Sequence, residues 1–182
     1  MNKNIPLAER IRPQNLDNYF GQQHLIGKDK PIRKFIESKQ LPSIIFWGPP
    51  GVGKTTLARI LANESDAQFF QLSAVDSTVK DVRAILETAQ KLPKVILFID
   101  EIHRFNKAQQ DSLLKAVENG TITLIGATTE NPSFEVISAL LSRCQVFTLK
   151  HLEKNDLDKI LHHAIDNDEV LKQKKINLKE TD

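Results

Sequence analysis

In the segment from Gly48 to Thr55, four residues separate Gly48 from Gly53, and a lysine and a threonine follow directly. In this pattern the glycines let backbone N–H groups surround phosphate oxygens, the lysine ammonium binds the outer phosphates, and the threonine hydroxyl binds Mg²⁺. A helix that begins at the loop turns its positive end toward the anion. A plain glycine turn between a strand and a helix is the alternative. The residues predicted to contact a nucleotide are Pro49, Pro50, Gly51, Val52, Gly53, Lys54, Thr55 and Thr56.

Two adjacent carboxylates, Asp100 and Glu101, follow the apolar run Val95–Ile99. A buried strand that ends in an acidic residue supplies the second half of a phosphate-loop site, so we expect Asp100 to hold a hydrated Mg²⁺ ion. Glu101 comes next and is placed to orient and polarise an attacking water molecule. The alternative is that both carboxylates only cap the following turn or face solvent.

The residues around these carboxylates separate the classes of nucleotide-binding protein. A GTPase carries a glycine three residues after the aspartate, together with an Asn-Lys-x-Asp segment. Here His103 stands at the first of these positions, and Asn106-Lys107 is followed by Ala108-Gln109. We therefore predict ATP as the nucleotide. An acidic water-positioning residue favours hydrolysis over phosphoryl transfer to a small metabolite.

Two residues farther along the chain also have types suited to this chemistry. The carboxyl ends of parallel strands share one crevice with the ligand, and the segment Gly126–Pro132 ends the fourth predicted strand. Within it we expect the Thr129 hydroxyl to contact the γ-phosphate or the water, unless the segment is only a turn. Arg143 is either a surface cation or an arginine finger that reaches the nucleotide of a neighbouring subunit. Cys144 is expected to be a small packing residue.

Short apolar runs alternate with helical stretches over most of the chain. Five strands separated by helices predict an α/β fold of the P-loop NTPase class with a mainly parallel sheet. The third run is apolar at every position, as expected for a strand covered on both faces. The predicted strands are Ser43–Trp47, Phe69–Leu72, Val95–Ile99, Thr121–Gly126 and Gln145–Leu149. The predicted helices are Lys54–Asn63, one opened by a capping box at Thr78 and Asp81, Lys107–Glu118 and Ser133–Leu141.

The pattern changes after Leu149. A helical stripe with no following strand comes next, with apolar residues Leu157, Ile160, Leu161, Ala164 and Ile165. The stretch Asp166–Asp182 is strongly polar. We therefore predict a nucleotide-binding α/β domain over residues 1–150. Residues 151–182 are expected to begin a helical lid that this chain does not complete.

Composition excludes several classes of protein. With 182 residues, 40% of them hydrophobic and 26% charged, the chain has ordinary globular usage and enough length for a buried core. Its longest apolar run is far shorter than the roughly 20 residues of a membrane-spanning helix. The N-terminus lacks the apolar stretch of a signal peptide. A single cysteine fits a reducing compartment, so we expect a cytoplasmic location and no membrane partner.

The charge balance leaves nucleic-acid binding open. The 25 basic and 23 acidic residues give a net charge of +2, and a small net charge can hide a local basic patch. Lys172, Lys174 and Lys175 form either a solvated face or a DNA site. Arg104 and Lys107 have three interpretations, namely contact with DNA in an assembled ring, a subunit interface, or simple exposure.

Together these residues resemble the core of the AAA+ ATPases, over a match from about Pro6 to Lys150. Within that superfamily the chain resembles the RarA/MgsA group, which is related to the eukaryotic Werner-helicase-interacting ATPase. The phosphate loop alone is typical of the whole superfamily, whereas the last two of the matching segments are more specific to the group. These segments are Pro6–Pro13, Gly21–Leu25, Phe46–Gly51, His103–Lys107 and Ile125–Phe134.

The resemblance implies roles for single residues. Those implied around the adenine and ribose are Arg12, Pro13, Gly21 and Gln22. Those in the two Walker motifs are Lys54, Thr55, Asp100 and Glu101. Thr129 falls at sensor 1, where other AAA+ proteins often carry an asparagine with a longer reach. Arg143 stands in the Ser-Arg-Cys arrangement of finger arginines in clamp-loader-like proteins.

The resemblance also implies a function. Proteins of the group are ATP-hydrolysing, with Mg²⁺, and act on DNA at stalled replication forks and in recombination and repair. The implied partners are DNA (forks, ends or single-stranded gaps), single-strand DNA-binding protein, and further copies of the same chain. The implied location is the cytoplasm, in association with the nucleoid. The alternatives are a clamp-loader-like subunit, a Holliday-junction motor subunit, or a slow nucleotide-gated module that binds DNA or protein.

The chain departs from the group by stopping at Asp182, inside the predicted lid. The sensor 2 arginine and the oligomerisation domain of the group come later. We therefore expect this chain, taken alone, to be a fragment that folds, binds nucleotide weakly, hydrolyses ATP poorly and stays mostly monomeric.

Overall fold

The computed structural model describes residues 5–174. By contacts the chain separates into two units, one of Gln22–His151 and one of Met1–Gly21 together with Leu152–Asp182. The unit boundary near residue 151 lies beside the boundary expected from the sequence. The first 21 residues, however, group with the C-terminal segment. The division into an ATPase domain of residues 1–150 and a lid of residues 151–182 stays a prediction.

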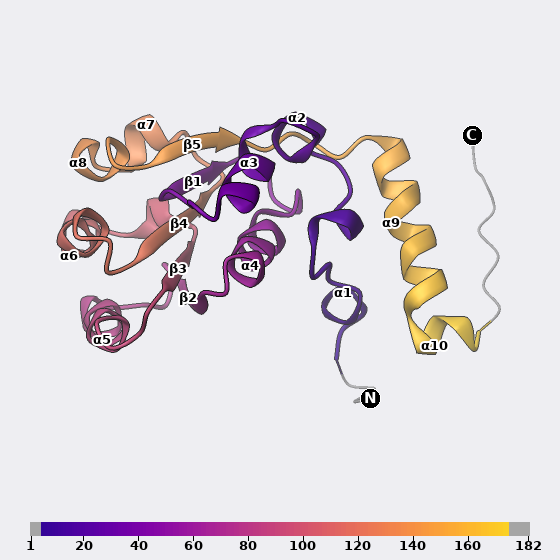
Figure 1. Ribbon diagram of the computed structural model, residues 1–182, viewed down its shortest axis with the longest axis horizontal. Coiled ribbons are helices and arrows are strands. Elements are labelled where there is room, and N and C mark those ends of the chain that lie inside the picture. The colour runs from indigo at the N-terminus through magenta and orange to yellow at the C-terminus, as the bar shows by residue number, and fades with distance from the viewer. Residues whose placement is uncertain (1–4, 175–182) are drawn as a thin grey trace. The chain divides into compact units, whose positions relative to one another are not determined.

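A five-stranded sheet in the order β2-β3-β4-β1-β5 is the centre of the larger unit (Figure 1). All four pairs of neighbouring strands are parallel, so the predicted α/β fold is confirmed. The order puts β4 between β1 and β3, which matters for the site because three successive carboxyl ends then meet at one edge. The strands are β1 (Ile44–Trp47), β2 (Gln68–Ser73), β3 (Val95–Asp100), β4 (Thr123–Thr128) and β5 (Gln145–Thr148).

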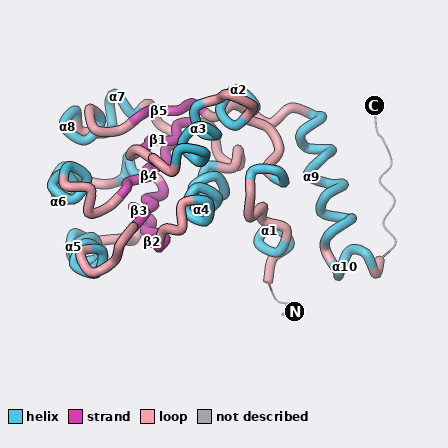
Figure 2. The backbone as a smooth tube through the Cα atoms, viewed as in Figure 1, coloured by secondary structure: helices cyan, strands magenta, loops and turns pink. Residues whose placement is uncertain are grey.

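Helices cover both faces of this sheet, as the buried central strands require. On one face lie α5 and α6, and on the other α4 and α3 (Figures 1 and 2). Side chains of β3 alternate between the two layers, and Leu97 and Ile99 belong to the core under α5 and α6. The bounds are α2 (Gln23–Ile26), α3 (Pro31–Ser38), α4 (Lys54–Glu64), α5 (Val79–Ala89) and α6 (Lys107–Glu118).

Two capping boxes fix where the helices of one layer begin. Thr78 and Asp81 cap α5 reciprocally, as the sequence predicted. Asn106 and Gln109 do the same for α6. The Gln109 amide also donates to the Ser77 carbonyl at 2.8 Å, so the starts of α5 and α6 are joined.

The fourth strand differs from the prediction of Thr121–Gly126. It begins two residues later and continues to Thr128, paired with β1 as far as Trp47. Gly126 was interpreted as the residue that ends the strand, but it lies inside it. A Cβ there would come within 2.7 Å of the Ile45 side chain and 3.0 Å of Ile102. This glycine therefore makes room for packing rather than for a turn.

The predicted helix Ser133–Leu141 is also wrong, because the segment forms two short helices, α7 (Pro132–Glu135) and α8 (Ser138–Leu141). In a continuous helix the Ile137 N–H would donate to a carbonyl four residues earlier. It donates instead to the side-chain oxygen of Gln110 at 2.9 Å. The amide of Gln110 donates to the Glu135 carbonyl at 3.0 Å, so one buried glutamine satisfies both sides of the break.

The smaller unit joins the N-terminal segment to the C-terminal helices. Its elements are α1 (Leu7–Arg10), the 3₁₀ turn η1 (Leu16–Asn18), α9 (Lys154–Asn167) and α10 (Glu169–Lys172). Arg10 donates to both carboxylate oxygens of Asp168 at 2.7 and 3.0 Å. Phe20 meets His163 edge to face at 5.7 Å. The predicted apolar stripe of this region lies on α9, where Ala164 is buried while Leu157 and Leu161 remain about half exposed.

The end of the predicted polar stretch, including Lys175, lies outside the described residues. Within residues 5–174, none of the helices combines the length and the apolar character needed to cross a bilayer.

Candidate active site

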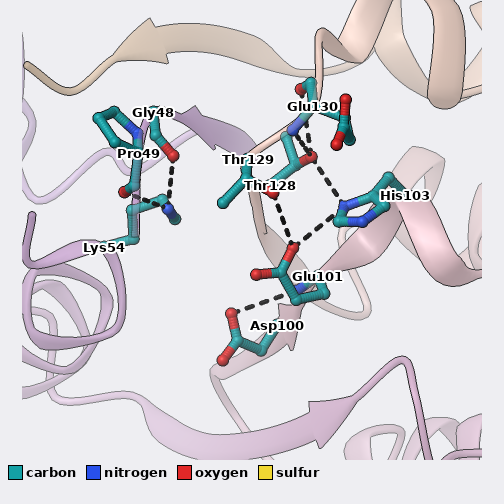
Figure 3. Close-up of polar contacts among 9 residues, drawn as sticks. All are labelled: Gly48, Pro49, Lys54, Asp100, Glu101, His103, Thr128, Thr129 and Glu130. Carbon is teal, nitrogen blue, oxygen red and sulfur yellow. Dashed lines mark hydrogen bonds and ion pairs between the residues drawn. The ribbon is translucent and has the colours of Figure 1, made fainter. Parts of the chain in front are cut away.

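Three neighbouring strands deliver the residues of the site to one edge of the sheet. The phosphate loop follows β1, the carboxylate pair ends β3, and the threonine pair ends β4, which lies between them. The strand that precedes the loop and the helix α4 that follows it are both present, as a phosphate-binding loop requires. Figure 3 shows the side chains that meet there.

Lys54 opens α4 and turns its ammonium back into its own loop. The Nζ atom donates to the carbonyls of Gly48 at 2.7 Å and Pro49 at 2.8 Å (Figure 3). The residue is only 7% exposed. Burial lowers the pKa of the ammonium, and the nearby charges of Glu101 and Asp100 oppose this shift. A cation held in this way can exchange two carbonyl partners for phosphate oxygens with little rearrangement.

Gly48 anchors the loop to the sheet. Its N–H donates to the Thr128 carbonyl at 3.1 Å, which extends the pairing of β1 with β4 by one bond. A Cβ at this position would lie 2.3 Å from the Leu149 carbonyl oxygen, so a side chain does not fit. The start of the phosphate loop is therefore fixed by backbone contacts on both sides.

Asp100 ends β3 with its carboxylate half-buried. The Glu101 N–H donates to Oδ1 at 3.2 Å. Burial raises the pKa of this carboxyl, the charge of Glu101 raises it further, and the hydrogen bond and Lys54 act in the opposite direction. A carboxylate that is costly to ionise fits a site completed by a cation. A carboxylate oxygen here and the Thr55 hydroxyl at the start of α4 are the hard oxygen ligands that Mg²⁺ prefers.

Glu101 has a left-handed backbone, with φ at 52° and ψ at 47°. This conformation is uncommon for a residue with a side chain, and it turns the chain into the single 3₁₀ turn η2 (Ile102–Arg104). The carboxylate atom Oε2 lies 3.1 Å from Nδ1 of His103 and 3.5 Å from the Thr129 hydroxyl. Both contacts use the same oxygen, and the other points away from the imidazole (Figure 3).

Sequence reasoning missed His103 and Thr128. Nδ1 of His103 lies 3.0 Å from the Thr128 hydroxyl, so the histidine joins the ends of β3 and β4. The sequence pattern around His103 speaks only against a GTPase, and the pattern that ends the fourth strand points to Thr129 instead of Thr128. Finding them would have required the strand order, because only that order makes residues 103 and 128 neighbours.

Arg143 lies after α8 on a different part of the unit. Its guanidinium forms a salt bridge with Glu118 at the end of α6 and donates to the Ala139 carbonyl. The side chain is about one third exposed. Its predicted role as a finger stays a prediction, and in the single chain its partner is Glu118. Cys144 packs against the core, and burial raises the pKa of its thiol to about 12.

The residues predicted around the base divide between the two units. Arg12, Pro13 and Gly21 belong to the smaller unit, and Gln22 to the larger one. The Gln22 side chain donates to the Lys150 carbonyl at 2.7 Å and accepts from the Lys150 N–H at 2.9 Å. It thereby holds the start of α2 beside the end of β5. The predicted contacts with adenine and ribose stay predictions.

Comparison with protein families identifies the class. Residues 44–152 match the family model described as "ATPase family associated with various cellular activities (AAA)". The match begins with β1 and includes the phosphate loop and both acidic residues. The chain belongs to this family, as the sequence predicted.

Relatives within the family are similar over most of the chain. It is 55% identical to Replication-associated recombination protein A of Coxiella burnetii over 91% of its length. It is 52% identical to the Escherichia coli protein of the same name over 89%, and 47% identical to ATPase WRNIP1 of Dictyostelium discoideum over 96%. The chain spans 38%, 37% and 20% of these relatives, respectively.

A solved structure with a similar fold is the Thermotoga maritima RuvB Holliday junction branch migration motor. The TM-score is 0.69 at 33% identity, over 86% of this chain and 54% of that one. The identity and the shared fold agree with the family match.

Proposed function

We propose that this chain carries the ATP-binding and ATP-hydrolysing domain of a AAA+ protein that acts on DNA in replication-associated recombination. The observation that carries this proposal is the meeting of a lysine-bearing phosphate loop with the Asp100–Glu101 pair at one edge of a parallel sheet. The relatives' names supply the setting in replication and recombination.

In this proposal the loop Gly48–Thr56 receives the phosphates of ATP. Lys54 exchanges the carbonyls of Gly48 and Pro49 for oxygens of the β- and γ-phosphates. Thr55 and Asp100 would hold Mg²⁺, which offsets the charge of the phosphates. Arg12, Pro13, Gly21 and Gln22 are the proposed contacts of the adenine and ribose.

Glu101 acts on the water. Because Oε2 accepts from His103 and Thr129, Oε1 is the oxygen proposed to accept a hydrogen bond from the attacking water. That water forms a bond to the γ-phosphorus while the bond to the β–γ bridging oxygen breaks. ADP leaves with the electron pair, the proton lost by the water passes to Oε1 of Glu101, and inorganic phosphate is the other product. Thr129 lies beside Glu101, and its hydroxyl is proposed to accept from the same water, or to donate to the γ-phosphate once it releases Oε2.

Arg143 acts on a neighbouring copy in this proposal. An arginine supplied by another subunit stabilises the charge of the transferred phosphoryl group. The guanidinium is paired with Glu118 in the single chain, so it must leave that partner to reach another subunit. A homo-oligomer is therefore part of the proposed function.

DNA is the proposed macromolecular partner, as forks, ends or single-stranded gaps, together with single-strand DNA-binding protein. Arg104 and Lys107 are exposed and lie just after the acidic end of β3, at η2 and the start of α6. Their positive charges can contact phosphates without reading sequence. The proposed location is the cytoplasm, at the nucleoid.

A branch-migration motor is the second candidate. It is favoured by the similarity to RuvB, although the identity of 33% is well below the 55% to the first relative. Stimulation of hydrolysis by a four-way junction but not by a fork would favour the motor. Stimulation by forks or ends would favour the first proposal.

The test is steady-state and single-turnover ATP hydrolysis by the full-length protein that carries this chain and by its Glu101→Gln variant, with and without single-stranded, duplex-end, forked and four-way DNA. The amide keeps the shape but loses the charge that polarises water. We expect ATP binding to be kept and hydrolysis to fall at least about 100-fold, the order of a general-base contribution. Equal turnover by the two proteins would remove Glu101 from the reaction.

A further inference from the structure

The imidazole of His103 bridges the catalytic end of β3 to the neighbouring strand. Its Nδ1 atom lies 3.1 Å from Oε2 of Glu101 and 3.0 Å from the Thr128 hydroxyl (Figure 3). The side chain is only 10% exposed. Because Nδ1 is close to two oxygen atoms at once, the hydrogens on the imidazole and on the Thr128 hydroxyl must be arranged so that a donor faces each acceptor.

The hydroxyl of Thr128 settles which group donates. It accepts from the Glu130 N–H at 3.0 Å and donates to the Glu130 carbonyl at 3.2 Å, which uses its single hydrogen. Toward His103 it can then only accept. The ionised carboxylate of Glu101 is also only an acceptor. A bare Nδ1 would therefore face two lone pairs, so the hydrogen of the neutral ring belongs on Nδ1.

The Thr128 end of this bridge is fixed to the sheet. Thr128 is completely buried, it pairs with Trp47 of β1, and its carbonyl accepts from the Gly48 N–H. Glu101 is the movable end, since its side chain is about one third exposed. An anchored donor that touches one carboxylate oxygen removes rotational freedom from that carboxylate.

We propose that His103 is a positioning residue for hydrolysis, whose Nδ1–H holds Oε2 of Glu101 against β4 so that Oε1 faces the attacking water. This inference rests on the proposed role of Glu101. His103 itself touches neither water nor phosphate in this mechanism. Its contribution is to orient the carboxylate, and Thr128 orients His103.

Two substitutions separate this role from simple packing. His103→Asn keeps an N–H donor near the position of Nδ1, whereas His103→Leu fills the space without a donor. In single-turnover assays we expect the leucine variant to hydrolyse roughly 10- to 100-fold more slowly, the range for a misplaced catalytic group. The asparagine variant should recover most of the rate. Affinity for ATP, measured by calorimetry, should stay within about two-fold for both, because the polar contacts described for His103 are with Glu101 and Thr128 and not with residues of the loop.

The matched control is His162→Leu, which removes an exposed histidine that bonds only to its own helix in the described structure. If the leucine variant keeps the wild-type rate, or hydrolyses faster, the proposal is wrong, since faster turnover would mean that His103 holds Glu101 back. Equal losses in the asparagine and leucine variants would also overturn it. If wild type and Glu101→Gln do not differ, the proposed function has failed instead.

A second measurement needs no activity. Nitrogen-15 NMR of the imidazole reports which ring nitrogen carries the proton, and thermal melts show whether each variant folds. We expect the Nδ1–H form for His103 in the wild-type chain. An Nε2–H form would overturn the proposal even if the leucine variant failed to fold.

Discussion

The phosphate loop and the acidic end of β3 hold their charged groups in different ways. The Lys54 ammonium is held by two carbonyls of its own loop, five and six residues earlier in the chain. The Glu101 carboxylate is held by His103 from the following turn and by Thr129, which comes directly after β4. One site is therefore built from a contiguous segment, and the other depends on how two strands pack.

This difference has a consequence for mutation. A change at Lys54 should alter binding of the phosphates and leave the rest of the unit in place, because its hydrogen-bond partners lie in the loop itself. A change that shifts β4 or the segment after it moves the groups that hold Glu101. The catalytic side should accordingly be sensitive to residues that never approach the nucleotide.

The largest effect, on affinity for ATP, is expected for a substitution in the phosphate loop. Lys54→Ala removes the ammonium and its two hydrogen bonds, both of which lie within the loop, so the chain should stay folded. We expect affinity for ATP with Mg²⁺ to fall at least about 100-fold, which corresponds to about 3 kcal/mol. Calorimetry measures this, with the exposed Lys91→Ala as the control. Unchanged affinity would contradict the role of the loop.

A smaller effect, on stability, is expected for the side chain of α6 that holds the segment after β4 in place. Gln110 of α6 is 2% exposed, and its amide bonds to Phe105, Glu135 and Ile137. Gln110→Leu removes these hydrogen bonds, and the one to the Phe105 carbonyl is buried, so the free energy of unfolding should fall by about 1–3 kcal/mol. Urea unfolding measures it.

The exposed Gln90→Leu substitution is the control for Gln110 and should change stability by less than about 0.5 kcal/mol. A similarly small effect at Gln110 would show that the break between α7 and α8 does not depend on this side chain. In that case the segment after β4 would not depend on α6 for its position, which would contradict the contrast drawn between the phosphate loop and the acidic end of β3.

The same contrast decides what the sequence could predict. The loop pattern could be recognised from the sequence, because Lys54 and the two carbonyls that hold its ammonium lie within seven consecutive residues, from Gly48 to Lys54. Its contacts with the nucleotide stay predictions. The strands of the sheet were predicted as elements for the same reason, since apolar runs are local. The bridge from His103 to Thr128 depends on β4 lying beside β3, and no local pattern contains that order.

Two errors have this origin as well. Gly126 is predicted to end the fourth strand, whereas in the structure it lies inside β4 and its missing side chain leaves room for Ile45 and Ile102. The helix after Asn131 looked continuous because its apolar spacing is helical, but Gln110 takes the N–H that would continue it. In the smaller unit, Arg10 and Asp168 are 158 residues apart, and nothing local indicates their pairing.

The smallest expected effect concerns Asp100, where stability and function should oppose each other. Burial and the charge of Glu101 raise the pKa of Asp100 above its ordinary value of 3.8. A raised pKa in the folded chain means that the protonated carboxyl favours folding. Its contribution is full below pH 3.8 and is lost as the pH rises through the folded pKa. At neutral pH the ionised carboxylate therefore costs stability.

Asp100→Asn should accordingly raise the free energy of unfolding at pH 7, by less than about 1 kcal/mol because solvent screens a half-exposed group. The gain should shrink toward zero near pH 3, roughly where both states are protonated. Urea unfolding at the two pH values measures this, with the exposed Asp111→Asn on α6 as the control. A loss of stability at pH 7 would mean that the hydrogen bond from the Glu101 N–H outweighs the cost of burial. If the gain is found together with weaker binding of ATP in the presence of Mg²⁺, the carboxylate is kept for the cation and not for the fold. The carboxylate at the end of β3 would then lower the stability of the folded chain, whereas the ammonium of the phosphate loop is hydrogen-bonded by carbonyls of its own loop.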